Sequence, residues 1–336
     1  MIQRTTVNLA QIACVLNEVV HPASNEKRCH RFVKDFEVDL EEIARFILEG
    51  LPAQFDLLLD RTEHFFGKTS INVLMFAACV GSVRIPIIWD DLGKTGNSNT
   101  IERKDLLKAL LRVMQRSRVQ ALIADREFIG GKWLAWLKNK RVPFVIRIRA
   151  NTIVQLGGFK DRADRFCKHL LVGECLVFST ACTLLGVRGY ISATRLEDGE
   201  LLIVFASHRR FNALEVYAKR WGIECLFKAF RTAGFNLSDS HVTDPARVQR
   251  LLVLVTLALV WAVRVGVLAS QLEPIAVKSH GRAVLSVFKL GLRVLLEVLA
   301  GGSRLLSFSQ VIAALFDTNG LVLKPCYARV QALRTG

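Results

Sequence analysis

The sequence lacks an apolar run of the roughly 20 residues that an ordinary membrane span needs. Its longest strongly apolar run, Leu251–Val263, covers 13 residues and lies between Arg250 and Arg264. We therefore expect a buried core helix there, and a membrane-associated protein remains an alternative that extraction with detergent would reveal. The first 25 residues also lack a long apolar segment followed by a small-residue cleavage site, so we predict a cytoplasmic protein without a secretory signal.

Metal-binding cysteine patterns are absent as well. The chain has eight cysteines, but none forms a Cys-x-x-Cys pair or a Cys/His cluster at zinc spacing. This excludes an ordinary structural zinc site. It predicts free thiols that pack as small apolar side chains in a reducing compartment.

Acidic side chains are the minority, with 30 Asp and Glu against 46 Lys and Arg and a net charge of +16. The excess is uneven: residues 1–60 carry six basic and ten acidic side chains (net −4), and residues 101–150 carry 13 and four (net +9). Such a basic excess favours polyanionic partners, nucleic acid first, over acidic-protein or small-cation chemistry, although solvated helix faces without a partner are the alternative. The 336 residues, 51% of them apolar, exclude a disordered chain and suit two or three structural units.

Hydrophobic periodicity predicts a mixed α/β order in the first half of the chain. Short helices are expected over 6–20, 26–36 and 40–51, with a turn at 21–25. Three antiparallel strands are expected over 55–60, 70–80 and 83–91, followed by helix 99–116, strand 119–125, helix 131–140 and strand 143–148. Residues 150–207 are predicted to form a β-rich segment, and helices are predicted over 213–232 and 245–268.

The predicted helix 213–232 carries one carboxylate within a basic stripe. At 100° per residue, four side chains lie within about 40° of Glu224, namely Tyr217, Arg220, Lys228 and Arg231. The stripe could face a polyanion near a reactive carboxylate. Ordinary i,i+4 surface ion pairs, worth a few tenths of a kcal/mol, would give the same spacing.

Two further acids, Asp60 and Asp125, each follow a short apolar run that we predict to be a strand. Buried strands deliver side chains to the edge of a sheet, and carboxylates suit Mg²⁺ or Mn²⁺. Together with Glu224 they could hold two such ions about 3.5–4 Å apart for in-line attack on a phosphodiester. Asp90 and Asp91 also follow an apolar run, so spacing alone leaves the choice of acids open.

Four longer segments resemble DDE transposases of bacterial insertion sequences, in the IS-four family. These are LLLDRTEHFFGKTSINVLM, IPIIWDDLGKTGNSNTIER, LIADREFIGGKWLAWL with PFVIRIRANT, and YAKRWGIECLFKAFRTAGFNLSDSHVTDPARVQRLLVLVTLAL. They span roughly residues 55–270 in the order of the family. The family's Tyr, Arg and Glu signature falls on Tyr217, Arg220 and Glu224, and its usual Lys, seven residues later, is Arg231 here.

The resemblance implies an α/β fold with a ribonuclease-H-like catalytic domain, interrupted by a β-rich insertion. The expected division is a short helical N-terminal region (1–52), the first catalytic part (53–149), the insertion (150–207), the last catalytic helices (208–270) and a C-terminal helical region (271–336). Relatives carry a longer helical N-terminal region, so a truncated start is an expectation here.

The resemblance also implies the site and its chemistry. Asp60, Asp125 and Glu224 become the catalytic acids and metal ligands, holding two Mg²⁺ or Mn²⁺ ions. The residues expected to contact DNA are Tyr217, Arg220, Lys228, Arg231 and Arg126. We expect cleavage at terminal inverted repeats and strand transfer into target DNA by a homodimer associated with the nucleoid. The alternative is a catalytically inactive or truncated relative that only binds DNA.

Overall fold

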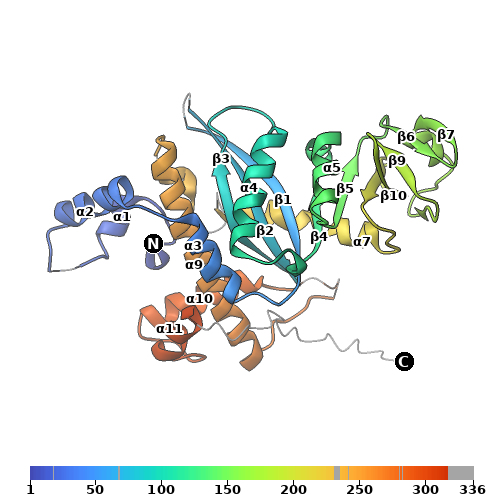
Figure 1. Ribbon diagram of the computed structural model, residues 1–336. Helices are drawn as coiled ribbons and strands as arrows, with labels where there is room; N and C mark the ends of the chain where they lie inside the picture. Colours follow the sequence, from blue (N-terminus) through green and yellow to red (C-terminus); the bar gives the residue numbers. More distant parts are fainter. Residues whose placement is uncertain are drawn as a thin grey trace, which may run out of the picture.

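The computed structural model describes residues 1–316 except 18, 67–68, 231–234, 241, 280 and 282. One large sheet runs through the molecule, with helical N- and C-terminal regions at one end and a β-rich lobe at the other (Figure 1). Its first strands are β1 Phe55–Phe66, β2 Thr69–Val80, β3 Val83–Asp91, β4 Val119–Ala124 and β5 Phe144–Ile148.

The first half of the sheet has the strand order β3-β2-β1-β4-β5. β1, β2 and β3 form antiparallel hairpins, whereas β1 pairs with β4, and β4 with β5, in parallel. Gly81, with a φ of 56°, supports the tight turn between β2 and β3. This order confirms the predicted ribonuclease-H-like α/β class.

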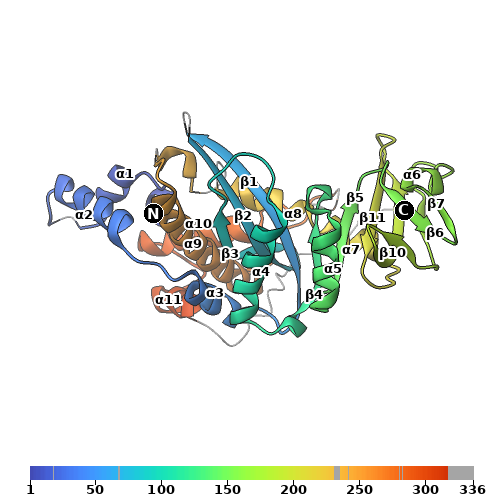
Figure 2. The ribbon, with the colours of Figure 1, turned by 45° about the horizontal axis from the view of Figure 1, so that its top comes forward.

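Helices cover both faces of this half-sheet (Figures 1 and 2). One face carries α4 Thr100–Val113 and α5 Gly131–Asn139, and the other carries α8 Trp221–Lys228 and α9 Pro245–Leu272. Local sequence sets their starts: Asn99 and Glu102 form a capping box on α4, and the Asp244 side chain accepts the N–H of Arg247 at the start of α9. The two faces of β1 therefore meet different helices.

The predicted β-rich insertion is present and extends the same sheet. β5 pairs antiparallel with β11, so the full order is β3-β2-β1-β4-β5-β11-β10-β9-β6-β7, with β8 paired to β10. The bounds are β6 Ile153–Leu156, β7 Phe159–Arg162, α6 Ala163–Phe166, β8 Cys175–Val177, β9 Cys182–Leu184, β10 Val187–Arg195 and β11 Leu201–Ala206. The insertion is thus joined to the first half of the sheet by backbone hydrogen bonds.

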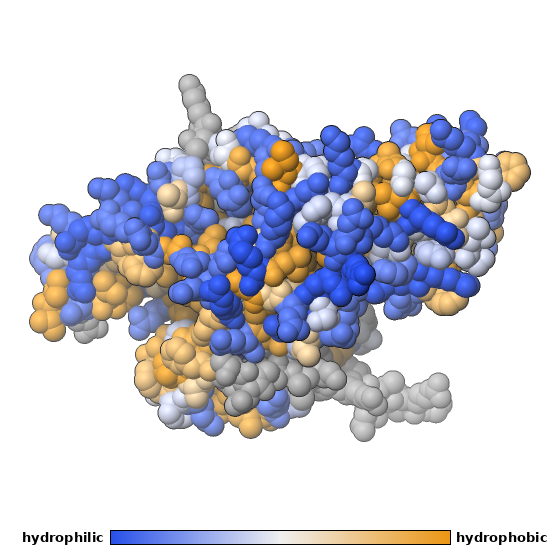
Figure 3. Space-filling view, viewed as in Figure 1, coloured by the Kyte–Doolittle hydropathy of each residue, from blue (hydrophilic) through white to orange (hydrophobic). Residues whose placement is uncertain are grey.

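The N- and C-terminal helices surround α9. They are α1 Leu9–Ala13, α2 Pro22–Asp35, α3 Leu40–Glu49, α10 Val287–Leu299 and α11 Phe308–Phe316. α9 is long and apolar enough to cross a membrane, but 78% of its most apolar window is buried inside the molecule. It is packed as the core helix that the sequence predicts. Figure 3 shows apolar residues gathered over α11, while the surface over α4 is mostly hydrophilic.

α9 and α10 cross at two glycines. A Cβ on Gly291 would lie 1.6 Å from the carbonyl oxygen of Ala262, and one on Gly266 would lie 2.1 Å from that of Val287. Side chains therefore cannot separate the two backbones at this point.

Three local predictions were wrong. The turn expected at 21–25 is the start of α2, because Pro22 occupies a first-turn position where a missing N–H costs nothing. The helix expected over 6–20 is only the short α1. The single helix expected over 213–232 is divided into α7 Ala213–Ala218 and α8, and its last residues lie outside the described part.

Candidate active site

Asp60 lies on β1 and points to the face that carries α8. The strand continues to Phe66, so the prediction that it ends at Asp60 was wrong. However, the parallel pairing of β1 with β4 ends at Leu59 and Ala124, and Asp60 is the next position. The side chain is buried, and its Oδ1 accepts the backbone N–H of Arg61 at 2.8 Å. Burial raises the pKa of Asp60 to about 6, although this hydrogen bond and the charge of Arg220 oppose the shift.

Asp125 follows β4 and is the residue before the short 3₁₀ helix η3 Arg126–Phe128. Since β1 and β4 are parallel and in register, Asp60 and Asp125 come from neighbouring strands at the same level of the sheet. The Tyr217 hydroxyl donates a hydrogen bond to Asp125 Oδ1 at 3.0 Å. Burial and the nearby Asp125 carboxylate raise the pKa of Tyr217, so this phenol stays protonated.

Arg220 joins the first acid to the third. Its Nη1 donates to Asp60 Oδ2 at 3.0 Å and its Nη2 donates to Glu224 Oε1 at 2.8 Å. The guanidinium is largely buried, whereas the Glu224 side chain is 43% exposed. The structure thus brings together five of the predicted site residues: Asp60, Asp125, Tyr217, Arg220 and Glu224.

The break between α7 and α8 places Arg220 at this position. Arg84, on β3, donates from Nε and Nη2 to the carbonyl oxygen of Lys219 at 3.1 and 2.8 Å. A Cβ on Gly222 would lie 2.3 Å from Arg84 Nε, so glycine leaves room for the guanidinium. Lys219 in turn pairs with the buried Asp56 at 2.6 Å. These contacts fix the helix junction to the sheet from both sides.

The donor set suits a hard divalent cation, because all three acids are carboxylates and come from separate, well-anchored elements. Within the residues that the structure describes, no three His, Cys, Asp or Glu side chains are grouped closely enough to hold a metal ion. The guanidinium of Arg220 pairs with two of the three acids, Asp60 and Glu224. The residues fit a metal ion on the condition that Arg220 gives up these partners.

Two other predicted DNA contacts, Lys228 and Arg126, are not part of this cluster. Lys228 is exposed at the end of α8. Arg126 is half exposed and its Nη1 lies 3.6 Å from Glu200 of the insertion. Arg231 lies outside the described residues.

The Asp91 side chain makes hydrogen bonds that stabilise a loop. Its Oδ1 accepts the backbone N–H groups of Asn72 at 3.1 Å and Gly93 at 3.3 Å, so it holds the loop after β3. This agrees with the loop role that its place before Gly93 and Gly96 suggests. Desolvation by burial, together with neighbouring Asp91, raises the pKa of Asp90.

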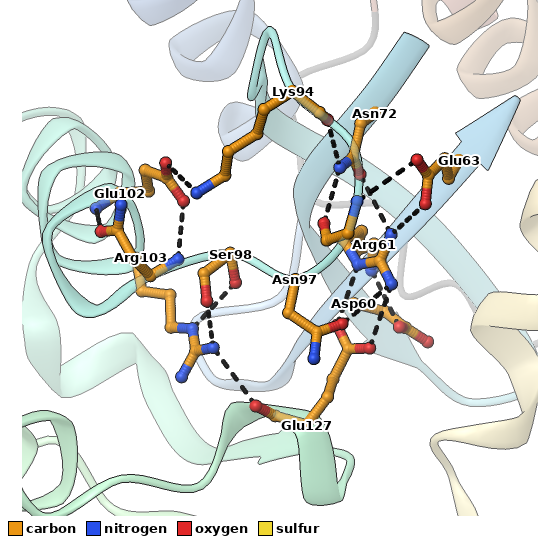
Figure 4. A network of polar contacts seen from close by, with 12 residues as sticks. Asp60, Arg61, Glu63, Asn72, Lys94, Asn97, Ser98, Glu102, Arg103 and Glu127 are labelled. Atoms are coloured by element: carbon orange, nitrogen blue, oxygen red, sulfur yellow. Dashed lines mark hydrogen bonds and ion pairs between the residues drawn. The ribbon is translucent and has the colours of Figure 1, made fainter. Parts of the chain in front are cut away.

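The sequence patterns missed an arginine-centred cluster on the other face of β1. Arg61 contacts Glu63, Asn72, Asn97 and Glu127, which come from four different segments (Figure 4). The available signal was the pair of charged residues beside the two strand acids, Arg61 after Asp60 and Glu127 two residues after Asp125. Nothing in the sequence shows that these two meet.

Comparison with known proteins was made for the sequence and for the fold. The sequence model of the family described as "Transposase DDE domain" matches residues 67–261, more than half of the chain. The matched span contains Asp125 and Glu224 and begins after Asp60. A search of curated protein sequences gives no significant match.

Among solved structures, the chain is similar to the piggyBac transposase in its synaptic complex with hairpin DNA. The two share 12% sequence identity with a TM-score of 0.44. The similarity covers 90% of this chain and 62% of the other, so this chain spans less than two thirds of its neighbour's length.

Proposed function

Since this chain belongs to the DDE transposase family, we propose that it cuts DNA strands at the ends of an insertion sequence and joins them to target DNA, in cut-and-paste transposition. The observation that supports the proposal is that neighbouring positions of one helical segment contact all three acids: Tyr217 donates to Asp125, and Arg220 donates to both Asp60 and Glu224. Such a set of carboxylates beside a cation suits phosphodiester chemistry.

DDE transposases use divalent metal ions, and in this proposal Asp60, Asp125 and Glu224 hold two Mg²⁺ or Mn²⁺ ions. When bound, such ions activate the attacking water or hydroxyl and stabilise charge on the leaving oxygen. The buried Asp60 carboxylate is a suitable ligand because a cation compensates the cost of keeping it ionised.

Arg220 has two successive roles in this mechanism. In the protein without DNA it neutralises Asp60 and Glu224. When DNA enters, the guanidinium turns to a phosphate near the cut, for which its planar fork is well suited. Tyr217 stays protonated and can donate its hydroxyl to a backbone oxygen or to Asp125.

The wider DNA contacts follow from charge. Lys228 and Arg126 are the further phosphate contacts of this proposal, with double-stranded DNA of the inverted repeats and the target as partner. Arg231, outside the described residues, keeps the same expected role. A homodimer would bridge two ends. We place the protein in the bacterial cytoplasm with the nucleoid, in keeping with a partner of this kind.

The test is strand cleavage on DNA that carries the inverted repeats flanking the gene, with Mg²⁺ or with EDTA, beside a binding assay in EDTA. Mg²⁺-dependent nicks at the repeat ends support the proposal. Binding in EDTA without nicks in Mg²⁺ would instead favour the alternative, an inactive or truncated relative that only binds DNA. Absence of both binding and cleavage contradicts both functions.

A further inference from the structure

Arg61 uses the full donor capacity of its guanidinium within the protein. Nε and Nη2 contact the two carboxylate oxygens of Glu127 at 3.2 and 3.4 Å. Nη1 donates to Glu63 at 2.9 Å and to Asn72 at 3.3 Å, and Nη2 also donates to Asn97 at 3.1 Å. These five contacts account for the five N–H groups of an arginine. The side chain is 15% exposed.

Arg61 joins the strand that carries Asp60 to the turn that follows Asp125. Arg61 follows Asp60 directly, and its backbone N–H holds the Asp60 carboxylate. Glu127 belongs to η3, the turn that begins after Asp125. Successive side chains on a strand point to opposite faces, so Asp60 faces α8 while Arg61 reaches the turn from the other face of the sheet (Figure 4).

Besides Arg61, helices hold the turn at Asp125: Arg103 of α4 donates to the carbonyl oxygen of Glu127 at 3.2 Å, and Tyr217 of α7 donates to Asp125 at 3.0 Å. Neither of these two contacts comes from β1. The backbone pairing of β1 with β4 ends one residue before the two acids. Beyond that point, the Arg61–Glu127 ion pair is the direct side-chain link between the strand of Asp60 and the turn of Asp125 among the contacts of the described residues.

We propose that Arg61 is a positioning residue that sets the separation of Asp60 and Asp125 for a shared divalent cation. This inference rests on the proposed function and adds a residue to it. Arg61 touches neither DNA nor the ion; it acts through Glu127 and through the strand that it shares with Asp60. An alternative in which Arg61 only stabilises the fold predicts lost stability without a change in ion affinity.

The experiment uses the full chain and Mn²⁺ as the probe. Free Mn²⁺ is followed by electron paramagnetic resonance during titration, and melting temperature and nicking of end-bearing DNA are measured on the same preparations. The variants are Arg61→Ala, Arg61→Lys, Glu127→Gln and the double variant Arg61→Ala with Glu127→Gln. Arg118→Ala is the matched control, because Arg118 donates to the carbonyl oxygens of Leu48, Leu51 and Pro52 near the start of β1, away from the acids.

We expect Arg61→Ala and Glu127→Gln each to weaken Mn²⁺ binding about tenfold, as loss of a residue that orients metal ligands does. The double variant should be no weaker than the worse single one, because both break the same link. The Mn²⁺ affinity of Arg61→Lys should lie between those of wild type and Arg61→Ala. Lysine keeps the positive charge but loses the planar set of N–H donors that a guanidinium offers. Arg118→Ala should lower the melting temperature and leave Mn²⁺ affinity unchanged.

Two results would overturn the inference. One is an Arg61→Ala chain that is folded and binds Mn²⁺ as tightly as wild type. The other is an equal loss of affinity in Arg118→Ala, which would make the effect one of general stability. A wild-type chain that neither binds Mn²⁺ nor nicks DNA overturns the proposed function itself, and is thereby distinguished from a failure of Arg61 alone.

Discussion

Two arginines on opposite faces of β1 each sit between two carboxylates, yet their surroundings differ. Arg61 makes five contacts with the protein and holds four segments together. Within the described part of the chain, Arg220 makes two hydrogen bonds, both to acids of the candidate site, and burial raises the pKa of one of these acids, Asp60. An arginine whose donors are all used by the protein holds its segments in place. An arginine paired with one buried carboxylate of raised pKa and one half-exposed carboxylate can change partners more easily. The comparison predicts different effects on cleavage, DNA binding and stability when residues of each cluster are replaced.

The largest effect should follow from Glu224→Gln. This change keeps side-chain size but removes the anion that would hold a divalent ion, so Mg²⁺-dependent cleavage should fall by orders of magnitude while DNA binding persists. Because the Arg220 pair is partly exposed at Glu224, the free energy of unfolding should change by less than about 1 kcal/mol. Nicking, end binding and melting temperature measured together check this.

Glu215→Gln is the matched control for that variant, as Glu215 is exposed on α7 and belongs to neither arginine cluster. It should nick like wild type. A Glu224→Gln chain that nicks at close to the wild-type rate would remove Glu224 from the catalytic acids and return its pair with Arg220 to an ordinary surface interaction.

Asp60→Asn should stabilise the metal-free protein while abolishing cleavage. The folded-state pKa of about 6 exceeds the ordinary value near 3.8, so the ionised carboxylate costs free energy above pH 6, and wild-type stability rises as pH falls from 6 towards 4. We expect the variant to be more stable by roughly 2 kcal/mol at pH 8 and to lose that advantage near pH 4. Denaturant unfolding in EDTA across this pH range measures it.

Asp56→Asn serves as the comparison for this measurement. Asp56 is also a buried aspartate of β1, but its carboxylate pairs with Lys219 at 2.6 Å. Because Asp56→Asn removes the partner of Lys219, this variant should not be more stable than wild type at pH 8. If Asp60→Asn is no more stable than wild type at pH 8, the cost of burying Asp60 has been overstated and the contrast between the two arginine clusters is weaker.

A smaller effect is expected from Arg220→Ala on DNA binding. Loss of one phosphate contact should reduce the slope of log K against log salt by about one. Lys228→Ala should act in the same direction, and Arg231, outside the described residues, carries the same prediction. Lys108→Ala is the control, since Lys108 pairs with Asp105 on the opposite face of the sheet. Unchanged slopes for Arg220→Ala would restrict this residue to pairing with the acids.

The smallest effect should come from Asp91→Asn, beside the Arg61 cluster. The amide oxygen can still accept the backbone N–H groups of Asn72 and Gly93, so stability should change by less than about 1 kcal/mol and cleavage should stay near wild type. Loss of cleavage in a folded Asp91→Asn chain would mean that the catalytic acids had been assigned wrongly.

The sequence was sufficient to predict those strands and helices that depend on neighbouring residues alone. Short apolar runs predicted the strands before Asp60 and Asp125, and two further apolar runs predicted the antiparallel strands β2 and β3. The junction between α7 and α8 could not be predicted, because no proline or glycine breaks the helix at Lys219. The break depends on Arg84, 135 residues away, which binds the Lys219 carbonyl oxygen.

The sequence predicted which residues form the candidate site better than it predicted which of them contact one another. Helical spacing placed Tyr217, Arg220 and Glu224 on one stripe, and the structure does gather them. Spacing could not show that Tyr217 and Arg220 reach Asp125 and Asp60, because those partners lie 92 and 160 residues away. The Arg61–Glu127 pair depends on strand order for the same reason.

The glycine crossing of α9 and α10 has a consequence for how the chain tolerates change. In most core positions, replacement by alanine deletes atoms and leaves a cavity. At Gly266 and Gly291 alanine adds an atom where a backbone oxygen already lies, so the helices must move apart. We expect a saturation library to accept only glycine at these two positions and to reject all other residues, with no graded preference for small side chains. Recovery would then require compensating changes on the facing helix, so the two helices can diverge in sequence only together.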